Sequence, residues 1–238
     1  MILTASVAEA VGELIEQLKK ELKKTKNVDN AVLKVVRAAF QETAKVRFEG
    51  NNYSDAWVKE AKKRGLLNLR RTPEALAQMT TRTSRQLFSG LGVLSKEELE
   101  ARYNVRVERY LKDMLIELHT LEQMAHSQVL PAAFGYLGEL SEAAANAKTA
   151  GIGVTPQIAT ANELGKLIAD LQKRLAVLGK AIARAESLHH DPVAAAEFLT
   201  ADGADAMAAV REGCDALELR VDDTRWPFPR YREMLFPV

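Results

Sequence analysis

The sequence predicts an all-α protein built from helical hairpins, one of them a long antiparallel pair, with an irregular C-terminal tail rich in proline and aromatic residues. Three observations support this prediction. Alanine and leucine dominate the chain while aromatic residues make up only 6% of it, which favours helices over sheets. Apolar residues recur at helical spacing in long segments. Serine, threonine, aspartate and proline stand where these segments begin, as is typical of helix N-termini.

The first two helices are expected over about residues 6–24 and 31–46, joined by a polar turn. Ser6 and Glu9 have the spacing of a capping box at the start of the first helix. The first helix carries an apolar stripe of Val7, Val11, Leu14, Ile15 and Leu18. The second should face inward with Val32, Val35, Val36, Ala39 and Phe40. A short turn between two helices predicts an antiparallel hairpin.

The segment from Phe48 to Ser54 is the least helical part of the first half, because its glycine and asparagines favour a tight turn. Ser54 should cap a short helix that contains Trp57 and ends at Gly65. Thr72 followed by Pro73 predicts another helix start, and glycines at 90 and 92 predict its end.

A long helix is expected from Ser95, which forms a capping box with Glu98. Its apolar pattern continues to Leu130, where Pro131 predicts a kink before helical sequence resumes to about residue 148. A turn at 151–153 leads to a second long helix over about 155–188. We expect these helices to form the long antiparallel pair.

The remaining chain predicts short helices after Asp191-Pro192 and over about 204–221, followed by the tail Trp226-Pro227-Phe228-Pro229-Arg230-Tyr231. Proline excludes a regular helix there, and the aromatic rings would bury well against a neighbour. These patterns divide the chain into residues 1–94, short helices with the Gly50–Trp57 turn, and residues 95–238, the long helical hairpin with two short helices and the C-terminal tail.

Composition narrows the possible partners and compartment. The net charge of +1 provides no strong field for nucleic acid or membranes, although residues 1–130 hold 22 basic against 17 acidic residues and the remainder holds 11 against 15. The single cysteine, Cys214, cannot form an internal disulfide, which suits the cytoplasm. No stretch approaches the length of a membrane span.

Few residues suggest chemistry of their own. The sequence has no glycine-rich phosphate loop and no zinc spacing of cysteine or histidine. His119, Glu122 and His126 share one helical face, where they could hold a metal. Solvent-facing or hydrogen-bonded histidines are the simpler interpretation, so the sequence predicts no catalytic, cofactor or metal residue and keeps a metal-binding bundle as a distant alternative.

Several segments resemble the carboxy-terminal region of type III glutamine synthetases. The sharpest is Phe48-Glu49-Gly50-Asn51-Asn52-Tyr53-Ser54-Asp55-Ala56-Trp57, continued by residues 59–66, and it is similar to F-x-G-[ND]-x-Y-S-x-x-W-x-x-E-A-x-x-R-G-L. Further similarities lie at residues 72–76, 98–103, 129–136 and 226–231. The start, residues 3–9, is similar to a family helix that follows the last catalytic strand, with Thr4 and Ala5 in place of asparagine and threonine.

The resemblance implies a helical, non-catalytic part of an ATP-dependent glutamate–ammonia ligase that serves subunit assembly in a homo-oligomer. ATP and a divalent metal, Mg or Mn, are implied for the full-length enzyme and none for this chain. The catalytic segment is implied upstream of Met1. The alternative is a free-standing helical binding or regulatory module. In either case, we expect the first helix to expose its apolar stripe when upstream sequence is missing, and to promote self-association.

The residues singled out as structural or interface candidates belong to the sharpest motif, the kink and the tail. They are Gly50, Asn52, Tyr53, Ser54, Trp57, Arg64, Gly65, Pro131, Trp226, Pro227 and Tyr231.

Overall fold

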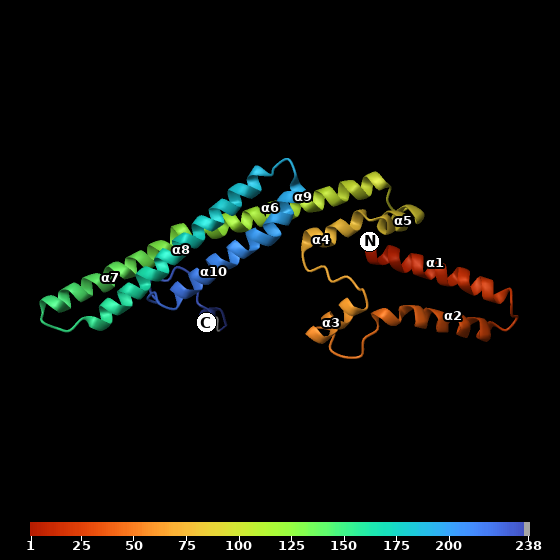
Figure 1. Ribbon diagram of the computed structural model, residues 1–238, viewed down its shortest axis with the longest axis horizontal. Coiled ribbons are helices and arrows are strands. Elements are labelled where there is room, and N and C mark those ends of the chain that lie inside the picture. The colour runs from red at the N-terminus through yellow and green to blue at the C-terminus, as the bar shows by residue number, and fades with distance from the viewer. Residues whose placement is uncertain (236–238) are drawn as a thin grey trace. The chain divides into compact units, whose positions relative to one another are not determined.

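The computed structural model describes the backbone of residues 1–235 and the side chains of residues 1–230 and 233–235. Over the described backbone the protein is helical and contains no strand, which confirms the all-α prediction (Figure 1). The internal contacts divide the chain into two compact units, residues 1–106 and 107–238. The predicted division at residue 94 falls just before helix α6 (Lys96–Met124), and both units contain part of this helix.

Unit 1, residues 1–106, contains five helices and the start of α6. Two of them form a hairpin at the N-terminus, and the other three are short. Their bounds are α1 Ile2–Leu22, α2 Val28–Glu42, α3 Asp55–Lys63, α4 Thr72–Ala77 and α5 Arg82–Gly90, with 3₁₀ turns at Thr43–Val46 and Gln78–Thr80.

Helices α1 and α2 run antiparallel, as predicted, and are joined by a short turn (Figure 1). The predicted N-terminus of α1 is wrong. The helix begins at Ile2, and the Ser6 hydroxyl lies inside it and donates to the carbonyl of Ile2 at 3.1 Å. Ala5 is buried in the small core of unit 1. This tertiary contact favours one more helical turn, which overrides the local capping pattern.

The predicted inward residues of α2 do face α1, because all five line the space between the two helices, but most of them are not buried there. Val35 is buried, but Val32, Val36 and Phe40 are exposed, as are Val7 and Val11 on α1. Helical periodicity identifies the apolar face correctly, but nothing in unit 1 covers that face along most of its length.

The core of unit 1 lies instead where α5 and the start of α6 meet the first turns of α1. Its buried residues are Ala5, Met79, Leu87, Phe88, Leu94 and Leu99. The predicted capping box at the start of α6 is confirmed: the Ser95 hydroxyl accepts from the N–H of Glu98 at 3.1 Å, and the Glu98 carboxylate accepts from the N–H of Ser95 at 2.8 Å. Two neighbouring donors without helical partners are thereby satisfied.

Unit 2, residues 107–238, contains the rest of α6 and the long hairpin. Two π-helical turns interrupt its helices, at Ala125–Val129 and Leu199–Gly203. The helices are α7 Leu130–Thr149, α8 Thr155–Ser187, α9 Pro192–Phe198, α10 Ala204–Glu218 and α11 Tyr231–Leu235.

Helix α8 is the centre of unit 2, because both α7 and α10 pack along it (Figure 1). Its buried stripe alternates spacings of three and four residues and consists of Leu164, Ile168, Leu171, Leu175, Leu178 and Ile182. This periodicity keeps one face of the helix toward its neighbours. Each such side chain contributes about 1.5–3 kcal/mol by burial, so the stripe is a large part of the core of unit 2.

Thr72 and Thr155 lie one position inside their helices and not at the N-cap, which is Arg71 and Val154 respectively. The predicted interruption at Pro131 takes the form of the π-helical turn directly before it, at Ala125–Val129. Proline at the start of α7 has no N–H to donate, so the backbone bonds of the preceding turn rearrange there.

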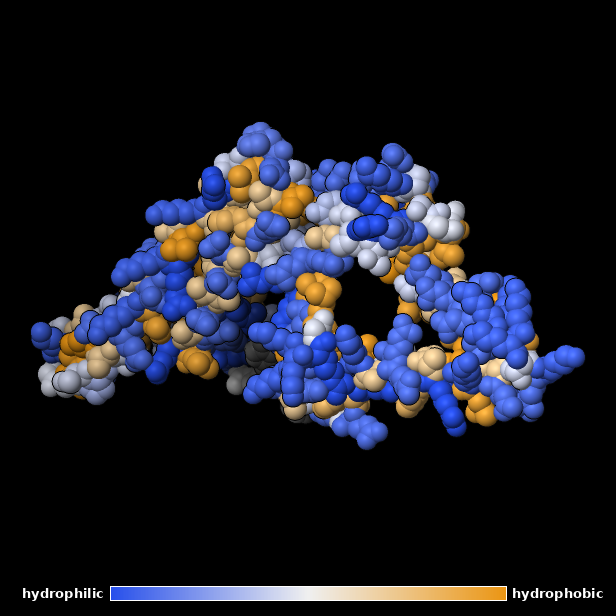
Figure 2. Space-filling model, turned by 45° about the vertical axis from the view of Figure 1, so that its right-hand side comes forward, coloured by the Kyte–Doolittle hydropathy of each residue, from blue (hydrophilic) through white to orange (hydrophobic). Residues whose placement is uncertain are grey.

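The surface of the protein is mixed. Figure 2 shows hydrophobic patches that reach the surface between hydrophilic side chains on one face of the molecule. Among the described residues, no helix combines the length and apolar character needed to cross a membrane.

Candidate interaction site

The turn from Phe48 to Ser54 is closed by local hydrogen bonds. The Asn51 side chain accepts from the N–H of Tyr53 at 2.9 Å, and the Ser54 hydroxyl donates to the carbonyl of Asn51 at 2.7 Å. The same hydroxyl accepts from the N–H of Trp57 at 3.5 Å, so Ser54 is the N-cap of α3, as predicted. Gly50 is required because an added Cβ would lie 2.9 Å from Cε1 of Phe48.

Arg64 joins this turn to the end of α2. Its Nη1 donates to the carbonyl of Arg47 at 2.7 Å and to that of Lys45 at 3.3 Å. Its Nε donates to the carboxylate of Glu60 at 2.7 Å, and this hydrogen bond holds the pKa of Glu60 below its ordinary value. The guanidinium also lies 5.5 Å from the ring centroid of Trp57. A residue chosen from a sequence motif thus fixes two segments to each other.

The aromatic residues of the turn divide into a packed pair and an exposed one. The rings of Phe48 and Trp57 lie 4.7 Å apart, and Trp57 is half-buried. Tyr53 is 98% exposed and Asn52 is exposed beside it. Gly65, with φ of +73°, ends α3 as predicted. The outer surface of this turn therefore presents Asn52 and Tyr53 to solvent.

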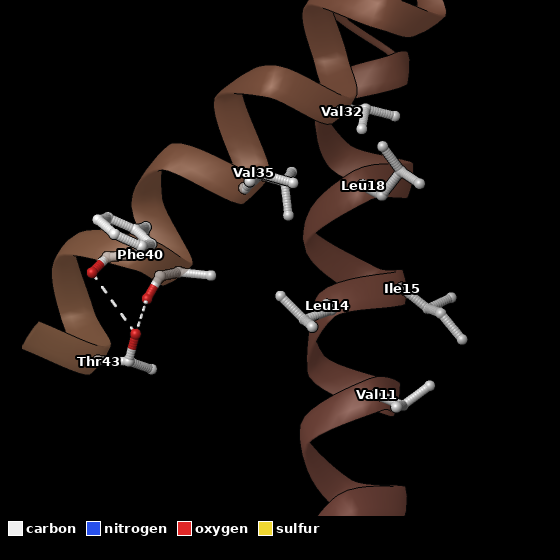
Figure 3. A pocket seen from close by; sticks show the side chains of 10 residues that line it. Val11, Leu14, Ile15, Leu18, Val32, Val35, Phe40 and Thr43 are labelled. Atoms are coloured by element: carbon white, nitrogen blue, oxygen red, sulfur yellow. Dashed lines mark hydrogen bonds between the residues drawn. The ribbon is translucent and has the colours of Figure 1, made fainter. Parts of the chain in front are cut away.

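An apolar groove lies between α1 and α2, and the sequence did not predict it. The groove has a volume of about 480 Å³. Its walls are Val11, Leu14, Ile15, Leu18, Val32, Val35, Val36, Ala39, Phe40 and Thr43. Figure 3 shows the two helices near each other at Leu18 and Val32 and diverging toward Val11 and Thr43.

A cation–π contact lies at one end of the groove. The guanidinium of Arg47 lies 3.4 Å from the ring centroid of Phe40, and its Nη1 donates to the hydroxyl of Thr43 at 2.9 Å. Because Arg64 in turn binds the carbonyl of Arg47, the groove and the turn belong to one connected region of unit 1. We call this region, residues 7–65, the hairpin–turn surface.

The predicted tail residues pack within unit 2. Trp226 lies 6.1 Å from Phe228 in an edge-to-face contact, and both pack against the main core. They line a cavity of about 330 Å³ together with Met124 and Cys214. Burial raises the pKa of the Cys214 thiol to about 11, which makes it a packing residue at neutral pH. Pro227 lies between the two rings in the chain, and the side chain of Tyr231 lies outside the described residues.

The three residues of the alternative metal site do not come together. Nε2 of His119 contacts a carboxylate oxygen of Glu186 at 3.1 Å, and His126 lies in the π-helical turn, which changes its helical phase. In the part of the chain that the structure describes, no three histidine, cysteine or acidic side chains are grouped to hold a metal.

Comparison with known proteins gives the family. Residues 31–148 match the glutamine synthetase C-terminal domain, a range that includes most of α2, the Gly50–Trp57 turn, Arg64 and Pro131. The chain belongs to this family. The glutamine synthetase C-terminal domain match ends at residue 148, but curated glutamine synthetases match almost the whole chain.

Three such relatives define the extent of the similarity. The chain is 31% identical over 246 residues to the type-3 glutamine synthetase of Dictyostelium discoideum, covering 99% of this chain and 33% of that protein. It is 28% identical over 239 residues to a glutamine synthetase of Bacteroides fragilis (strain YCH46), covering 98% and 33%. A glutamine synthetase of Butyrivibrio fibrisolvens is 30% identical over 209 residues, covering 87% and 30%. The chain spans about a third of the length of these relatives.

Proposed function

We propose that this chain acts as the carboxy-terminal, non-catalytic part of a type III glutamine synthetase and contributes to the assembly of its subunits in the cytoplasm. The observation that supports the proposal is the match to three glutamine synthetases, which extends over almost the whole chain in two of them. The relatives' names give glutamine synthetase as the activity of the complete protein, and the resemblance implies that this protein joins ammonia to glutamate with ATP.

The exposed apolar and aromatic surface of unit 1 is consistent with an assembly role. The hairpin–turn surface offers an apolar groove and an exposed tyrosine, which are features of contact surfaces. Within residues 1–230 and 233–235, side chains that could hold a divalent metal are not grouped. As the resemblance implies, we assign ATP and Mg or Mn to the other two thirds of the enzyme.

The reading frame upstream of the Met1 codon tests this proposal directly. It should encode a segment bearing the glutamates, histidine and arginines that hold metal and phosphate, in the same frame or in an adjacent gene. The absence of such a segment from both places would overturn the proposal. As a second measurement, the 238-residue chain should have no glutamine synthetase activity when assayed with glutamate, ammonia, ATP and Mg or Mn.

A regulatory module is the second candidate, and the open groove between α1 and α2 is the observation that favours it, because a partner could dock there. The chain would then bind an assembled glutamine synthetase and change its activity. Size-exclusion chromatography of the chain with an intact type-3 enzyme distinguishes the two. Co-migration with altered activity supports the regulatory module, and separate elution counts against it.

A further inference from the structure

We propose that the groove between α1 and α2 is a self-association surface, on which a second copy of this chain docks with its α1 antiparallel to the first. The surface comprises the apolar faces of α1 and α2 on residues 7–22 and 32–40. The resulting dimer has two-fold symmetry, so the same surface is used on both copies. This proposal does not rest on the role in glutamine synthetase assembly proposed above.

The amount of exposed apolar surface supports a pairing interface. Eight large apolar side chains on these two apolar faces are between 38% and 62% exposed. They are Val7, Val11, Leu14, Ile15, Leu22, Val32, Val36 and Phe40. At about 150 Å² or more for a fully exposed side chain of this size, they present roughly 600 Å² per chain. A two-fold pair would bury roughly 1,200 Å² in total, at the lower end of specific interfaces.

The shape of the groove permits the entry of another helix. Figure 3 shows the labelled side chains of Leu14 and Val35 directed into the space between the helices, which widens toward Val11 and Thr43. The opposite end is closed by the turn and by the ion pair of Lys34 with Glu21 at 2.7 Å. An α1 from a second copy could complete the apolar layer that α2 leaves open.

The charges along α1 select both the occupant and its direction. Residues 1–16 contain three glutamates and no lysine or arginine, whereas residues 17–26 contain five lysines and one glutamate. In an antiparallel pair the acidic half of each α1 lies beside the basic half of the other. In a parallel pair like charges would lie side by side. A second α1, antiparallel to the first, therefore complements the surface in both apolar character and charge.

Charged residues also lie close enough to the stripe to act across such an interface. Lys19 is four residues from Ile15, and therefore adjacent to it on the helix surface, and Lys23 follows one turn later. Glu16 already pairs with Lys19 at 2.7 Å within one chain. This exposed pair is easily exchanged for a contact with the partner copy, because exposed ion pairs are weak.

The first experiment measures the mass of the full 238-residue chain by sedimentation equilibrium, at concentrations up to about 50 µM, where an interface of this size should be occupied. Val11→Glu should raise the dimer dissociation constant roughly 30-fold or more, because two carboxylates would be buried by symmetry. Val105→Glu is the matched control, since Val105 is 64% exposed in helix α6 and Val11 is 49% exposed in α1. Circular dichroism should show unchanged helix content in both variants.

The second experiment tests the direction of pairing. The triple variant E9K/E13K/E16K makes α1 uniformly basic and should weaken self-association about tenfold at low ionic strength, with a smaller effect in high salt. In a parallel pair the change would replace one like-charge contact by another and leave affinity unchanged. Mixing this variant with K19E/K20E/K23E should restore pairing as a heterodimer.

Each outcome is decisive. A wild-type dimer that Val11→Glu dissociates and Val105→Glu leaves intact supports the surface. A strictly monomeric wild-type chain, a series of open aggregates, or a dimer insensitive to Val11→Glu would overturn it. A dimer insensitive to the triple charge change would overturn the antiparallel arrangement. The upstream reading frame and the activity assay are unaffected by these results, so failure here is distinguishable from failure of the proposed function.

Discussion

Replacement of Arg64 by methionine should release the Gly50–Trp57 turn from the end of α2. Methionine keeps an apolar stem of similar length beside Trp57 but removes every donor. The structure assigns Arg64 two hydrogen bonds to backbone carbonyls that lie 17 and 19 residues earlier, at Arg47 and Lys45. Among the side-chain hydrogen bonds of residues 7–65, the next longest, from Lys34 to Glu21, spans only 13 residues.

The expected loss follows from those contacts. A hydrogen bond from a charged donor at 2.7 Å contributes about 1.5–3 kcal/mol, and the longer one at 3.3 Å contributes about 0.5–1 kcal/mol. The contact with the Trp57 ring at 5.5 Å adds about 0.5–1 kcal/mol. The Glu60 pair joins half-exposed side chains four residues apart on one helix, where such pairs contribute little, and is left out of this sum. We expect the free energy of unfolding of unit 1 to fall by about 3 kcal/mol.

The assay is urea denaturation followed by tryptophan fluorescence. Trp57 and Trp226 are the only tryptophans, one in each unit, so a Trp226→Phe background makes Trp57 report unit 1 alone. Lys63→Met is the matched control, because Lys63 is exposed at the end of the same helix. A loss below about 0.5 kcal/mol for Arg64→Met, or an equal loss in the control, would refute the role of Arg64.

Three further predictions concern local packing and titration. Ser95→Ala should lower the free energy of unfolding by about 1 kcal/mol by removing the α6 cap, whereas Lys96→Ala should change it little; equal effects on urea midpoints would contradict this. Gly203→Ala places a Cβ 2.8 Å from the fully buried Leu199 and should destabilise by about 1–3 kcal/mol, while Gly165→Ala, with open space around it, should stabilise α8 by about 0.5–1 kcal/mol. Calorimetry that gives both substitutions the same sign would refute the packing at 203. The pKa of the Cys214 thiol is about 11 in the folded protein against an ordinary 9.0. The stabilisation that this thiol gives the folded state is therefore complete below pH 9 and is lost as the pH rises through 11. Denaturation of wild type and Cys214→Ala across this range should therefore show the steeper decline in the wild type, and parallel curves would contradict it.

Local sequence rules predicted those features that depend only on neighbouring residues. The Ser95–Glu98 capping box and the Gly65 helix end are both present as expected. The same capping spacing at Ser6 and Glu9 failed because Ala5 buries itself in a core formed by residues more than 70 positions away. A capping pattern is therefore reliable only where no tertiary contact favours a longer helix.

The candidate site was predictable in part. The motif singled out Arg64 and Trp57, but periodicity gave no indication that Arg64 binds backbone carbonyls of another segment. The sequence predicted the apolar face of α2 but not its exposure. Amphipathicity indicates that a helix face needs a partner, but it does not identify the partner. For the α8 stripe the partners are within the chain, and there the prediction of a long packed hairpin is confirmed.

The central claim is that this chain is the assembly-bearing carboxy-terminal part of a type III glutamine synthetase. The most direct test replaces the matching third of the Dictyostelium discoideum enzyme with this chain and measures particle mass by native mass spectrometry, beside the intact enzyme and a version lacking that third. We expect the enzyme lacking that third to dissociate into smaller species and the chimera to have the mass of the intact particle. Normal assembly of the truncated enzyme, or a chimera with the same particle mass as the truncated enzyme, would contradict the assembly role.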